Sequence, residues 1–259
     1  MACVACRLIA ILSGALLTLS FAPFNSWLAS FISLASFAYL LFKTPKSAVL
    51  LSYLYGIGLF GTGSSWVYVS IHEYGNTNVA LALLLVTLFT LGLSLFLALF
   101  GLIFKYLQRN NQTNNYLIFA ALWVLIEWLR SWLFTGFPWL FVGYGHIDTW
   151  LASYMPIFGV YGASFVTALL SAYTAKTVIA RSIDKHIAIA TSALLLCWPL
   201  GNIAWTQISG AALTIGAIQP NLSLHEKWDR NNLGKILYQL QQQTLAIENS
   251  DMIVWPEAA

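Results

Sequence analysis

Seven long apolar segments take up most of the first 203 residues, and they constrain the fold more than any other feature. They run approximately over 8–21, 27–42, 48–71, 79–104, 116–134, 154–174 and 187–203. A helix needs about 20 mostly apolar residues to cross a bilayer. The first two segments are short, and together they are expected to form a hairpin. Only 8% of the 259 residues are charged, against roughly 25% in soluble domains. The sequence therefore predicts a polytopic α-helical membrane domain.

The basic residues predict how these segments are oriented. Loops 22–26, 72–78 and 135–153 contain no Lys or Arg, whereas the alternate loops and the N-terminus contain Arg7, Lys43, Lys46, Lys105, Arg109, Lys176, Arg181 and Lys185. Because cytoplasmic loops carry the excess of Lys and Arg, we expect a cytoplasmic N-terminus and, after seven spans, an outer C-terminal part. The first segment is expected to stay as a membrane helix, since another apolar segment follows it at once.

Cysteine spacing and net charge bear on the function classes that are open to this chain. Cys3, Cys6 and Cys197 form neither a disulfide framework nor a metal-ligand spacing, and we expect no metal and no cofactor. The net charge is +3, without a run of Lys or Arg. This pattern gives no indication of a nucleic-acid partner.

Two charged residues inside the fifth segment are candidates for function. Glu127 and Arg130 are three residues apart and therefore lie on one helical face. Ionisable residues in a membrane segment usually pair or line a polar cavity. One interpretation is a buried ion pair that fixes helix packing, and the other is that Arg130 binds a lipid phosphate, which suits its planar guanidinium. In the outer loop, His72 and Glu73 are either ordinary loop residues or face a lipid headgroup or the outer domain.

A different composition begins after Trp205. Residues 213–219 resemble a short strand, Asp229 is expected to cap a Gln-rich helix that reaches about Glu248, and 252–255 resemble a second strand. Strand, crossover helix and strand predict a parallel pair. We therefore expect a transmembrane domain over 1–206 and the start of an outer α/β domain over 207–259.

Glu257 follows the second predicted strand in the sequence Trp255-Pro256-Glu257. Proline cannot donate to a strand ladder, so this carboxylate is expected just past the carboxyl end of the strand. Ligands of open α/β sheets bind at that edge. The alternative is that Glu257 is an exposed acid without a role.

Several short motifs together carry a resemblance to a known family. They are Phe21-Ala22-Pro23-Phe24, Trp66-Val67-Tyr68-Val69-Ser70-Ile71, Glu127-Trp128-Leu129-Arg130, Thr135-Gly136-Phe137-Pro138-Trp139, Gly159-Val160-Tyr161-Gly162, Gln219-Pro220-Asn221, Lys227-Trp228 and Trp255-Pro256-Glu257-Ala258-Ala259. With these motifs the chain resembles the N-terminal part of the apolipoprotein N-acyltransferases, bacterial inner-membrane enzymes with a nitrilase-like α-β-β-α sandwich domain. The resemblance runs over essentially the whole chain.

The resemblance implies a fold, an activity and a site. It implies eight membrane helices, with the catalytic domain inserted between the last two. The implied activity moves an acyl chain from a phospholipid to the N-terminal diacylglyceryl-cysteine of an apolipoprotein through a thioester. The implied triad is Glu-Lys-Cys, in which Glu257 matches the glutamate, and Trp228 matches a tryptophan near the site. We add Arg130 and His72 as candidate substrate-binding residues and expect a monomer.

The chain departs from the family after Glu257. The family's lysine, cysteine and eighth helix lie downstream of Trp255-Pro256-Glu257, and Cys197 lies in a membrane segment ahead of the outer domain. We therefore expect roughly the first half of a family member, from a truncated gene, a split gene or a partial sequence, without activity of its own. A smaller departure is His146, where we expect a glutamine in many relatives.

Two other classes of function stay open. One is a membrane lipid-binding or transport protein that uses Glu127 and Arg130 as pathway residues, although it leaves the outer strand-helix-strand unexplained. The other is an inert fragment, or one half of a two-chain enzyme whose second chain supplies the lysine, the cysteine and the last helix.

Overall fold

The computed structural model describes residues 3–108, 114–183 and 187–257. Their contacts divide the chain into two units, Met1–Ile203 and Ala204–Ala259. Arg109 and Lys185, on which part of the predicted orientation rests, lie outside the described residues, as do Ala258 and Ala259 of the last motif.

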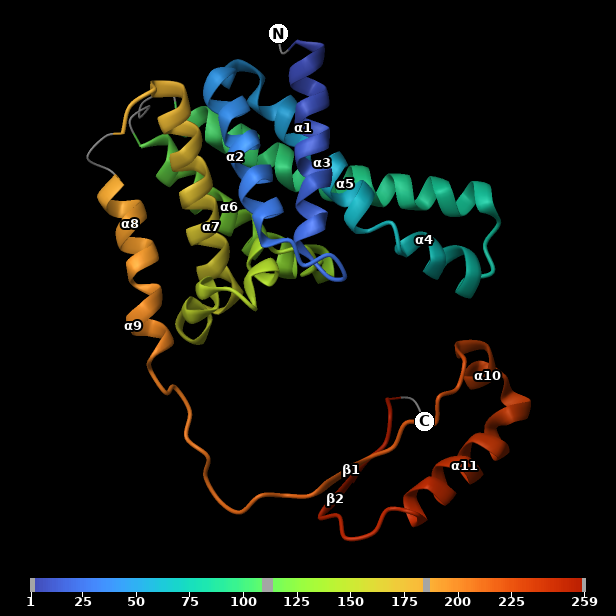
Figure 1. Ribbon diagram of the computed structural model, residues 1–259. Helices are drawn as coiled ribbons and strands as arrows, with labels where there is room; N and C mark the ends of the chain where they lie inside the picture. The colour runs from blue at the N-terminus through green and yellow to red at the C-terminus, as the bar shows by residue number, and fades with distance from the viewer. Residues whose placement is uncertain (1–2, 109–113, 184–186, 258–259) are drawn as a thin grey trace. The chain divides into compact units, whose positions relative to one another are not determined.

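The first unit is a bundle of helices (Figure 1). Its helices are α1 (Val4–Leu17), α2 (Trp27–Lys43), α3 (Ala48–Gly63), α4 (Val67–Val69), α5 (Val79–Gln108), α6 (Asn115–Trp132), α7 (Met155–Ala180), α8 (Ile187–Leu195) and α9 (Cys197–Gly201). A π-helix covers Ser70–Tyr74, and short 3-10 helices cover Thr18–Ser20, Pro45–Ser47, Leu133–Thr135, Val142–His146 and Trp150–Tyr154. All seven predicted apolar segments therefore contain helix.

Three helical stretches are long and apolar enough to cross a membrane: Val79–Gln108, Asn115–Thr135 and Trp150–Ala180. The helices Trp27–Lys43 and Pro45–Gly63 are bent by 109° and add a fourth span if the bent pair counts as one. Helix α1 has 14 residues, or about 21 Å at 1.5 Å per residue, which is shorter than a hydrocarbon core of about 30 Å. By length and composition the described residues thus support three to four spans of the predicted seven.

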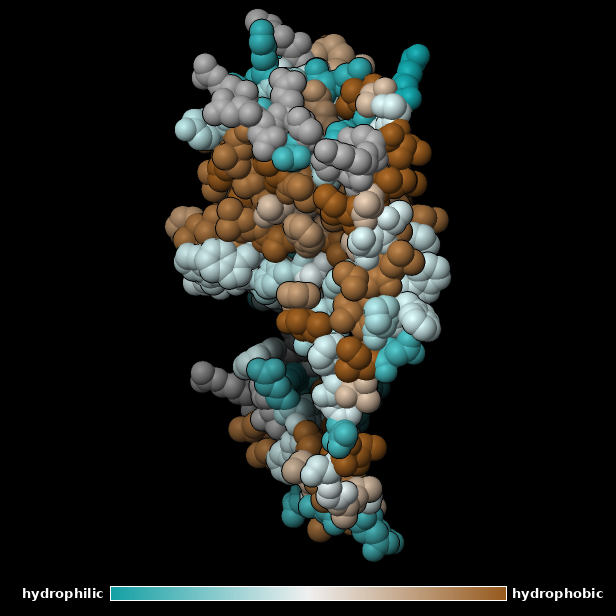
Figure 2. Space-filling model, turned by 90° about the vertical axis from the view of Figure 1, so that its left-hand side faces the viewer, coloured by the Kyte–Doolittle hydropathy of each residue, from teal (hydrophilic) through white to brown (hydrophobic). Residues whose placement is uncertain are grey.

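Apolar side chains are exposed on the outside of this unit. In Figure 2 they form a broad band over the face that is turned to the viewer. Leu195 of α8 is 73% exposed and Trp198 of α9 is 79% exposed. On α5, Leu88 and Leu102 are exposed as well. A surface of this kind fits a hydrocarbon environment, because lipid tails are as apolar as leucine.

Helix α3 packs against both α1 and α5. Glycines make the crossing with α1 close. A Cβ atom on Gly14 would lie 2.0 Å from the carbonyl oxygen of Tyr55, and one on Gly58 would lie 2.0 Å from the carbonyl oxygen of Ile11. Small residues at such crossings let two backbones approach in a membrane.

Replacing Gly58 with valine is therefore expected to disrupt the contact between α1 and α3. The new side chain would meet the backbone of α1, which cannot move aside as a flexible side chain can. Overpacking typically costs about 1–3 kcal/mol, so the yield of folded protein should fall in fluorescence-detected size-exclusion chromatography. Gly61→Val is the matched control in the same helix, because a Cβ there meets only the Cγ2 atom of Thr90, at 3.8 Å. Equal yields of the two variants would contradict the close crossing.

An aromatic core holds α6 in place. The ring of Phe37 on α2 stacks on Tyr55 of α3 with ring centroids 4.2 Å apart, and it contacts Phe119 and Trp123 of α6 edge-on. Phe100 of α5 lies 5.3 Å from Phe119. These contacts fix the rotation of α6 about its axis, and with it the side of α6 that carries the charged residues.

The second unit contains two short parallel strands, β1 (Ile215–Ala217) and β2 (Met252–Val254), and the helices α10 (Leu224–Trp228) and α11 (Leu233–Leu245). Ile215 pairs with Met252 and Ala217 with Val254. Ile218, Ile236 and Leu240 form its small core. The predicted parallel pair with a crossover helix is confirmed.

The helical caps in this unit differ from the prediction. Asp229 does not cap the long helix: its Oδ1 atom accepts from the backbone N–H of Asn231 and begins a 3-10 turn over Arg230–Asn232. Ahead of it, Ser223 and Glu226 form a capping box that starts α10. The prediction missed α10 because a five-residue helix shows too little periodicity to be recognised.

Candidate functional site

The chain makes an unusual turn where α6 ends. Phe134, Thr135 and Gly136 have φ angles of 55°, 71° and 84°, and Leu140 has a φ of 61°. Residues other than glycine rarely adopt positive φ, and a β-branched threonine there is an outlier. Strained backbone of this kind persists only where its surroundings hold it, and it is concentrated at ligand clamps and active sites.

Arg130 holds the first part of this turn. Its side chain is only 3% exposed, and its Nη1 atom donates to the carbonyl oxygens of Phe137 and Trp139. The guanidinium carbon lies 4.7 Å from the ring centroid of Phe141 and 5.1 Å from that of Phe60. Hydrogen bonds and aromatic faces together solvate this buried cation.

Glu127 holds the far end of the same segment. Its carboxylate Oε1 accepts from the backbone N–H of Val142 at 2.8 Å and from the indole Nε1 of Trp123 at 2.9 Å. The second oxygen, Oε2, is buried without a hydrogen-bond partner among the described residues, although the Ser164 hydroxyl lies close to the carboxylate.

Glu127 and Arg130 are two buried, oppositely charged residues that attract each other without a direct salt bridge. Both residues are described, and each one bonds backbone groups of the following loop, with no salt bridge between them. The reason is geometric. The two residues are three positions apart, so both side chains face the loop, whose carbonyl and amide groups need partners in an apolar setting. Together Glu127 and Arg130 hold the two ends of residues 137–142, an arrangement that we call the bracket. Their opposite charges also attract each other.

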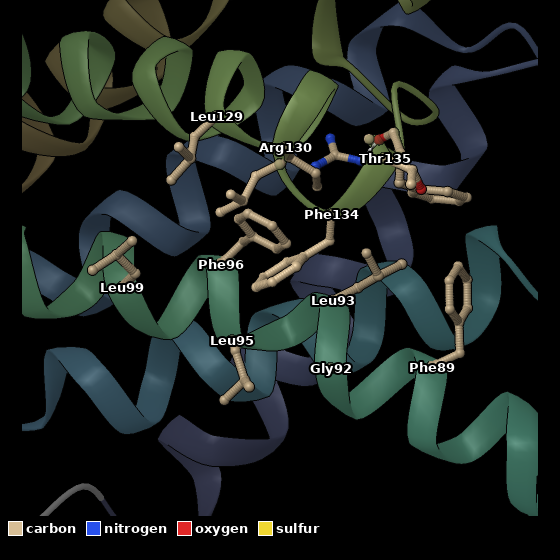
Figure 3. A pocket seen from close by; sticks show the side chains of 13 residues that line it. Phe89, Gly92, Leu93, Leu95, Phe96, Leu99, Leu129, Arg130, Phe134 and Thr135 are labelled. Atoms are coloured by element: carbon tan, nitrogen blue, oxygen red, sulfur yellow. Dashed lines mark hydrogen bonds between the residues drawn. The ribbon is translucent and has the colours of Figure 1, made fainter.

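An apolar cavity of about 500 Å³ lies beside Arg130 (Figure 3). One wall comes from α5, with Phe89, Leu93 and Phe96 among its members, and the other comes from the end of α6 and the turn. The ring of Phe137 packs edge-on against Phe89 with centroids 5.2 Å apart. Arg130 and Thr135 are the polar members of this lining. The turn that Arg130 holds thus forms part of the cavity wall.

Two histidines lie in the loops of the first unit. His72 is half-buried in the π-helix, its Nδ1 atom lies 2.7 Å from the carbonyl oxygen of Thr77, and its ring lies beside Tyr68. His146 is fully buried, with Nε2 at 3.0 Å from the Ser30 hydroxyl. Burial lowers the pKa of His146 to about 4, so its imidazole is neutral at pH 7 and ties its loop to α2.

The second unit brings two of the predicted residues to one end of its sheet. Glu257 is exposed and lies three residues beyond the last residue of β2. Its backbone carbonyl accepts from the Lys227 Nζ atom at 2.7 Å. Trp228, the neighbour of Lys227 at the end of α10, is 71% exposed. The lysine therefore links α10 to the segment that carries the glutamate.

Sequence reasoning missed several of these contacts. Lys227 was part of a recognised motif but had no predicted contact with Glu257, because residues 30 apart in sequence give no local signal. The contact of Trp123 with Glu127 did have a local signal, because Trp123 lies four residues before Glu127 on the same helical face. The cavity had a weaker signal in the sequence: Gly92 interrupts a long run of larger apolar residues in the helix α5.

Comparisons with known proteins agree with these observations. Residues 13–173 match the model of the apolipoprotein N-acyltransferase N-terminal domain. The apolipoprotein N-acyltransferase of Coxiella burnetii is 40% identical over 257 residues, which are 97% of this chain and 53% of that protein. The one from Pseudomonas syringae pv. tomato is 38% identical and the one from Methylococcus capsulatus 36%, over 98% and 97% of this chain and 51% of each relative.

This chain therefore spans about half the length of the curated relatives it matches. These relatives do not favour the alternative of a transport protein, since their name describes acyl transfer to an apolipoprotein. The family model covers more than half of the chain, and the relatives match it almost from end to end. The chain belongs to the apolipoprotein N-acyltransferase family.

Proposed function

We propose that this chain supplies the membrane domain and the general base of an enzyme that acylates apolipoproteins in the bacterial inner membrane. The donor is a phospholipid and the acceptor is the N-terminal diacylglyceryl-cysteine of an apolipoprotein. Identity of 36–40% over almost the whole chain carries this proposal. The place of Glu257, just beyond the carboxyl end of β2, supports its role as the base.

The proposed chemistry has two steps, both of which move a proton through Glu257. In the first, Glu257 takes the proton of a cysteine thiol, the thiolate attacks the acyl ester carbon, and the lysophospholipid leaves with the proton. In the second, the acceptor amine attacks the thioester, Glu257 takes the amine proton, and the cysteine leaves and is protonated again. Splitting one difficult transfer into two easier ones is the advantage of covalent catalysis.

The thiol for these steps is not within residues 198–259, because Cys197 is the last cysteine of the sequence. Cys197 itself is buried in α9 of the first unit. In the proposal, residues 207–259 are the start of a nitrilase-like domain, and its remainder, with the lysine, the cysteine and an eighth helix, comes from further sequence or a second chain. The complete protein is proposed to act as a monomer or as such a two-chain unit.

Three residues of this chain are proposed to contact or position the substrates. The indole of Trp228 is exposed and follows Lys227, which bonds the backbone carbonyl of Glu257, and it offers an apolar face to a substrate chain. Arg130 supports phospholipid binding at the outer end of α6, where its bonds shape the cavity wall. His72 lies half-buried in the loop after α3 and α4, at the level of a headgroup in the proposed orientation.

The proposed orientation places seven spans in the membrane, with a cytoplasmic N-terminus and residues 207–259 in the periplasm. Its basis is the distribution of Lys and Arg between alternate loops. Reporter fusions at residues 44 and 183 should be cytoplasmic, and fusions at residues 75 and 210 should be periplasmic. An inverted pattern at two sites would overturn the orientation.

The proposed activity is tested with membranes that contain residues 1–259 alone or together with a downstream half that supplies the lysine, the cysteine and the last helix. Membranes are incubated with phospholipid and a diacylglyceryl peptide, and N-acylated peptide is sought by mass spectrometry. We expect product only from the coexpressed halves, since a carboxylate without a thiol has no nucleophile to activate. Product from residues 1–259 alone would overturn the assignment of the nucleophile to the downstream half. Absence of product from both samples, when both halves are folded, would overturn the proposed activity.

A further inference from the structure

Two cysteine thiols meet at the N-terminal end of α1 (Figure 1). Cys3 is the N-cap residue of this helix, and Cys6 lies in its first turn. Their Sγ atoms are 2.7 Å apart and share a hydrogen bond. Both thiols are free, as is the thiol of Cys197 in α9. The structure therefore places a pair of nucleophilic side chains, rather than a lone cysteine, at one end of the first unit.

The cap of α1 favours the thiolate form of Cys3. An N-cap side chain usually accepts a backbone N–H with an oxygen atom, and here the Cys3 sulfur accepts from the backbone N–H of Cys6 at 3.3 Å. The hydrogen bond from the Cys6 thiol, together with this backbone bond, lowers the pKa of the Cys3 thiol below its usual value. The positive end of the helix dipole acts in the same direction. Because the thiolate is the reactive form of cysteine, Cys3 is the stronger nucleophile of the pair.

The two thiols differ in their access to solvent. Cys3 is exposed, whereas Cys6 is half-buried and packs against the apolar core of the first unit. A reagent from solvent therefore reaches Cys3 first, and the Cys6 thiol lies where it can attack a group bound to the Cys3 sulfur. An accessible cysteine of low pKa beside a second cysteine is the usual arrangement of a redox-active pair.

Disulfide chemistry needs fewer partners than a metal centre. Zinc in structural sites is almost always held by four ligands. Within residues 3–108, 114–183 and 187–257, no group of three or more His, Cys, Asp and Glu side chains could hold a metal ion. A disulfide, by contrast, is complete with the two thiols that the structure brings together.

Basic side chains next to the pair favour a negatively charged reaction partner. Arg7 follows Cys6 directly and lines a cavity of about 550 Å³ together with Lys46 and Lys105. The described lining of this cavity contains no acidic residue, and a cluster of cations attracts anions. A small disulfide that carries carboxylates, such as glutathione disulfide, has the complementary charge. In the proposed orientation this end of α1 is cytoplasmic, where disulfides are usually transient.

We propose that Cys3 and Cys6 form a redox-active dithiol that exchanges with anionic low-mass disulfides. The Cys3 thiolate attacks one sulfur of the small disulfide, whose S–S bond breaks, and the other half leaves as a thiolate. The Cys6 thiol then loses its proton to solvent and attacks the Cys3 sulfur, which releases the second half as a thiolate. Two electrons pass from the protein to the small disulfide, and the two thiol protons end on the released thiols. An excess of the small thiol reverses both steps.

The test uses reduced protein in detergent with glutathione disulfide as the probe, and it is independent of acyl transfer. At timed intervals free thiols are blocked with iodoacetamide. The tryptic peptide that ends at Arg7 contains both cysteines and is analysed by mass spectrometry. We expect a short-lived adduct with one glutathione, then a disulfide between Cys3 and Cys6, while the buried Cys197 stays reduced. Excess glutathione should restore both thiols. Lasting adducts on both cysteines, or no reaction of either one, would overturn the proposal.

Two variants separate the roles of the thiols. Cys6→Ser removes the thiol of the second step, so the glutathione adduct on Cys3 should persist. Cys3→Ser keeps α1 capped, because serine is a good N-cap residue, and adducts should form on Cys6 about tenfold more slowly than on Cys3 of Cys6→Ser. Cys197→Ser is the matched control and should leave both steps unchanged. Equal rates at the two positions would contradict the assignment of Cys3 as the attacking thiol.

The charge of the partner is tested on the unchanged protein with cystamine, a cationic disulfide. At low salt, glutathione disulfide should react several-fold faster than cystamine, and high salt should remove the difference because it screens the attraction. Lys46→Gln should reduce this preference. Lys43→Gln, which removes an exposed charge outside the cavity lining, should leave it unchanged. Equal rates for the two disulfides at low salt would overturn the assignment of an anionic partner.

Discussion

Replacing Glu257 with glutamine is expected to lower the rate of N-acylation about 10²–10⁴-fold, the usual contribution of a general base, when both halves of the enzyme are present. Glutamine keeps the size of the side chain but cannot take a proton. Glu257→Asp keeps the carboxylate and withdraws it by about one bond length, and misplacement by about 1 Å can cost about 100-fold. The order of rates should be wild type, aspartate, then glutamine, measured as N-acylated peptide per minute.

Glu248→Gln is the matched control for this prediction, since Glu248 is an exposed carboxylate of the same unit, ahead of β2. It should leave the rate unchanged. Release of lysophospholipid gives a second readout, because a base for the thiol is needed before any peptide reacts. A Glu257→Gln enzyme that retains half of the wild-type rate would contradict the assigned role and leave the glutamate as an exposed acid.

Arg130→Ala is expected to destabilise the first unit by about 3–5 kcal/mol, the usual cost of removing one member of a buried charged network. The change leaves the carbonyl oxygens of Phe137 and Trp139 without their donor and leaves the Glu127 carboxylate buried without a cation nearby. The measurement is the thermal midpoint and the folded yield of purified protein in detergent.

Glu127→Gln separates the bracket from a simple ion pair. The amide oxygen of glutamine can still accept from Val142 and Trp123, so we expect a loss of only about 1 kcal/mol, the net value of one hydrogen bond. A dominant ion pair would instead make Glu127→Gln and Arg130→Ala equally costly. Leu125→Ala, at an exposed position of the same helix, controls for ordinary truncation and should have little effect.

The contacts of Arg130 and Glu127 also shape the cavity beside α5. Because Arg130 and Glu127 hold opposite ends of residues 137–142, a change in either one moves the wall of the cavity as well as the loop.

Much of the architecture could be predicted from local patterns in the sequence. Apolar runs predicted the helices of the first unit, because hydrophobic burial in lipid leaves a signal at every position of a segment. The parallel pairing of β1 and β2 followed from the crossover helix between them, since two parallel strands cannot be joined by a tight turn. The number of spans does not follow from apolar runs alone. Helices α1, α2 and α3 and the stretch Ile187–Gly201 are each too short to count as a span by length, and the bend between α2 and α3 depends on packing.

The sequence by itself determined that Glu127 and Arg130 share one face of a membrane helix, and that Glu257 follows a strand. Only the tertiary structure decided their partners. Apart from the Trp123 indole, the partners of Arg130 and Glu127 are backbone groups 7 to 15 residues away. These groups reach them through a left-handed turn that residue preferences disfavour. The Lys227 side chain meets the backbone carbonyl of Glu257 across 30 residues, and the cavity beside α5 depends on a second wall from the end of α6. Contacts of this kind arise from the path of the chain in space, and a local pattern carries no signal of that path.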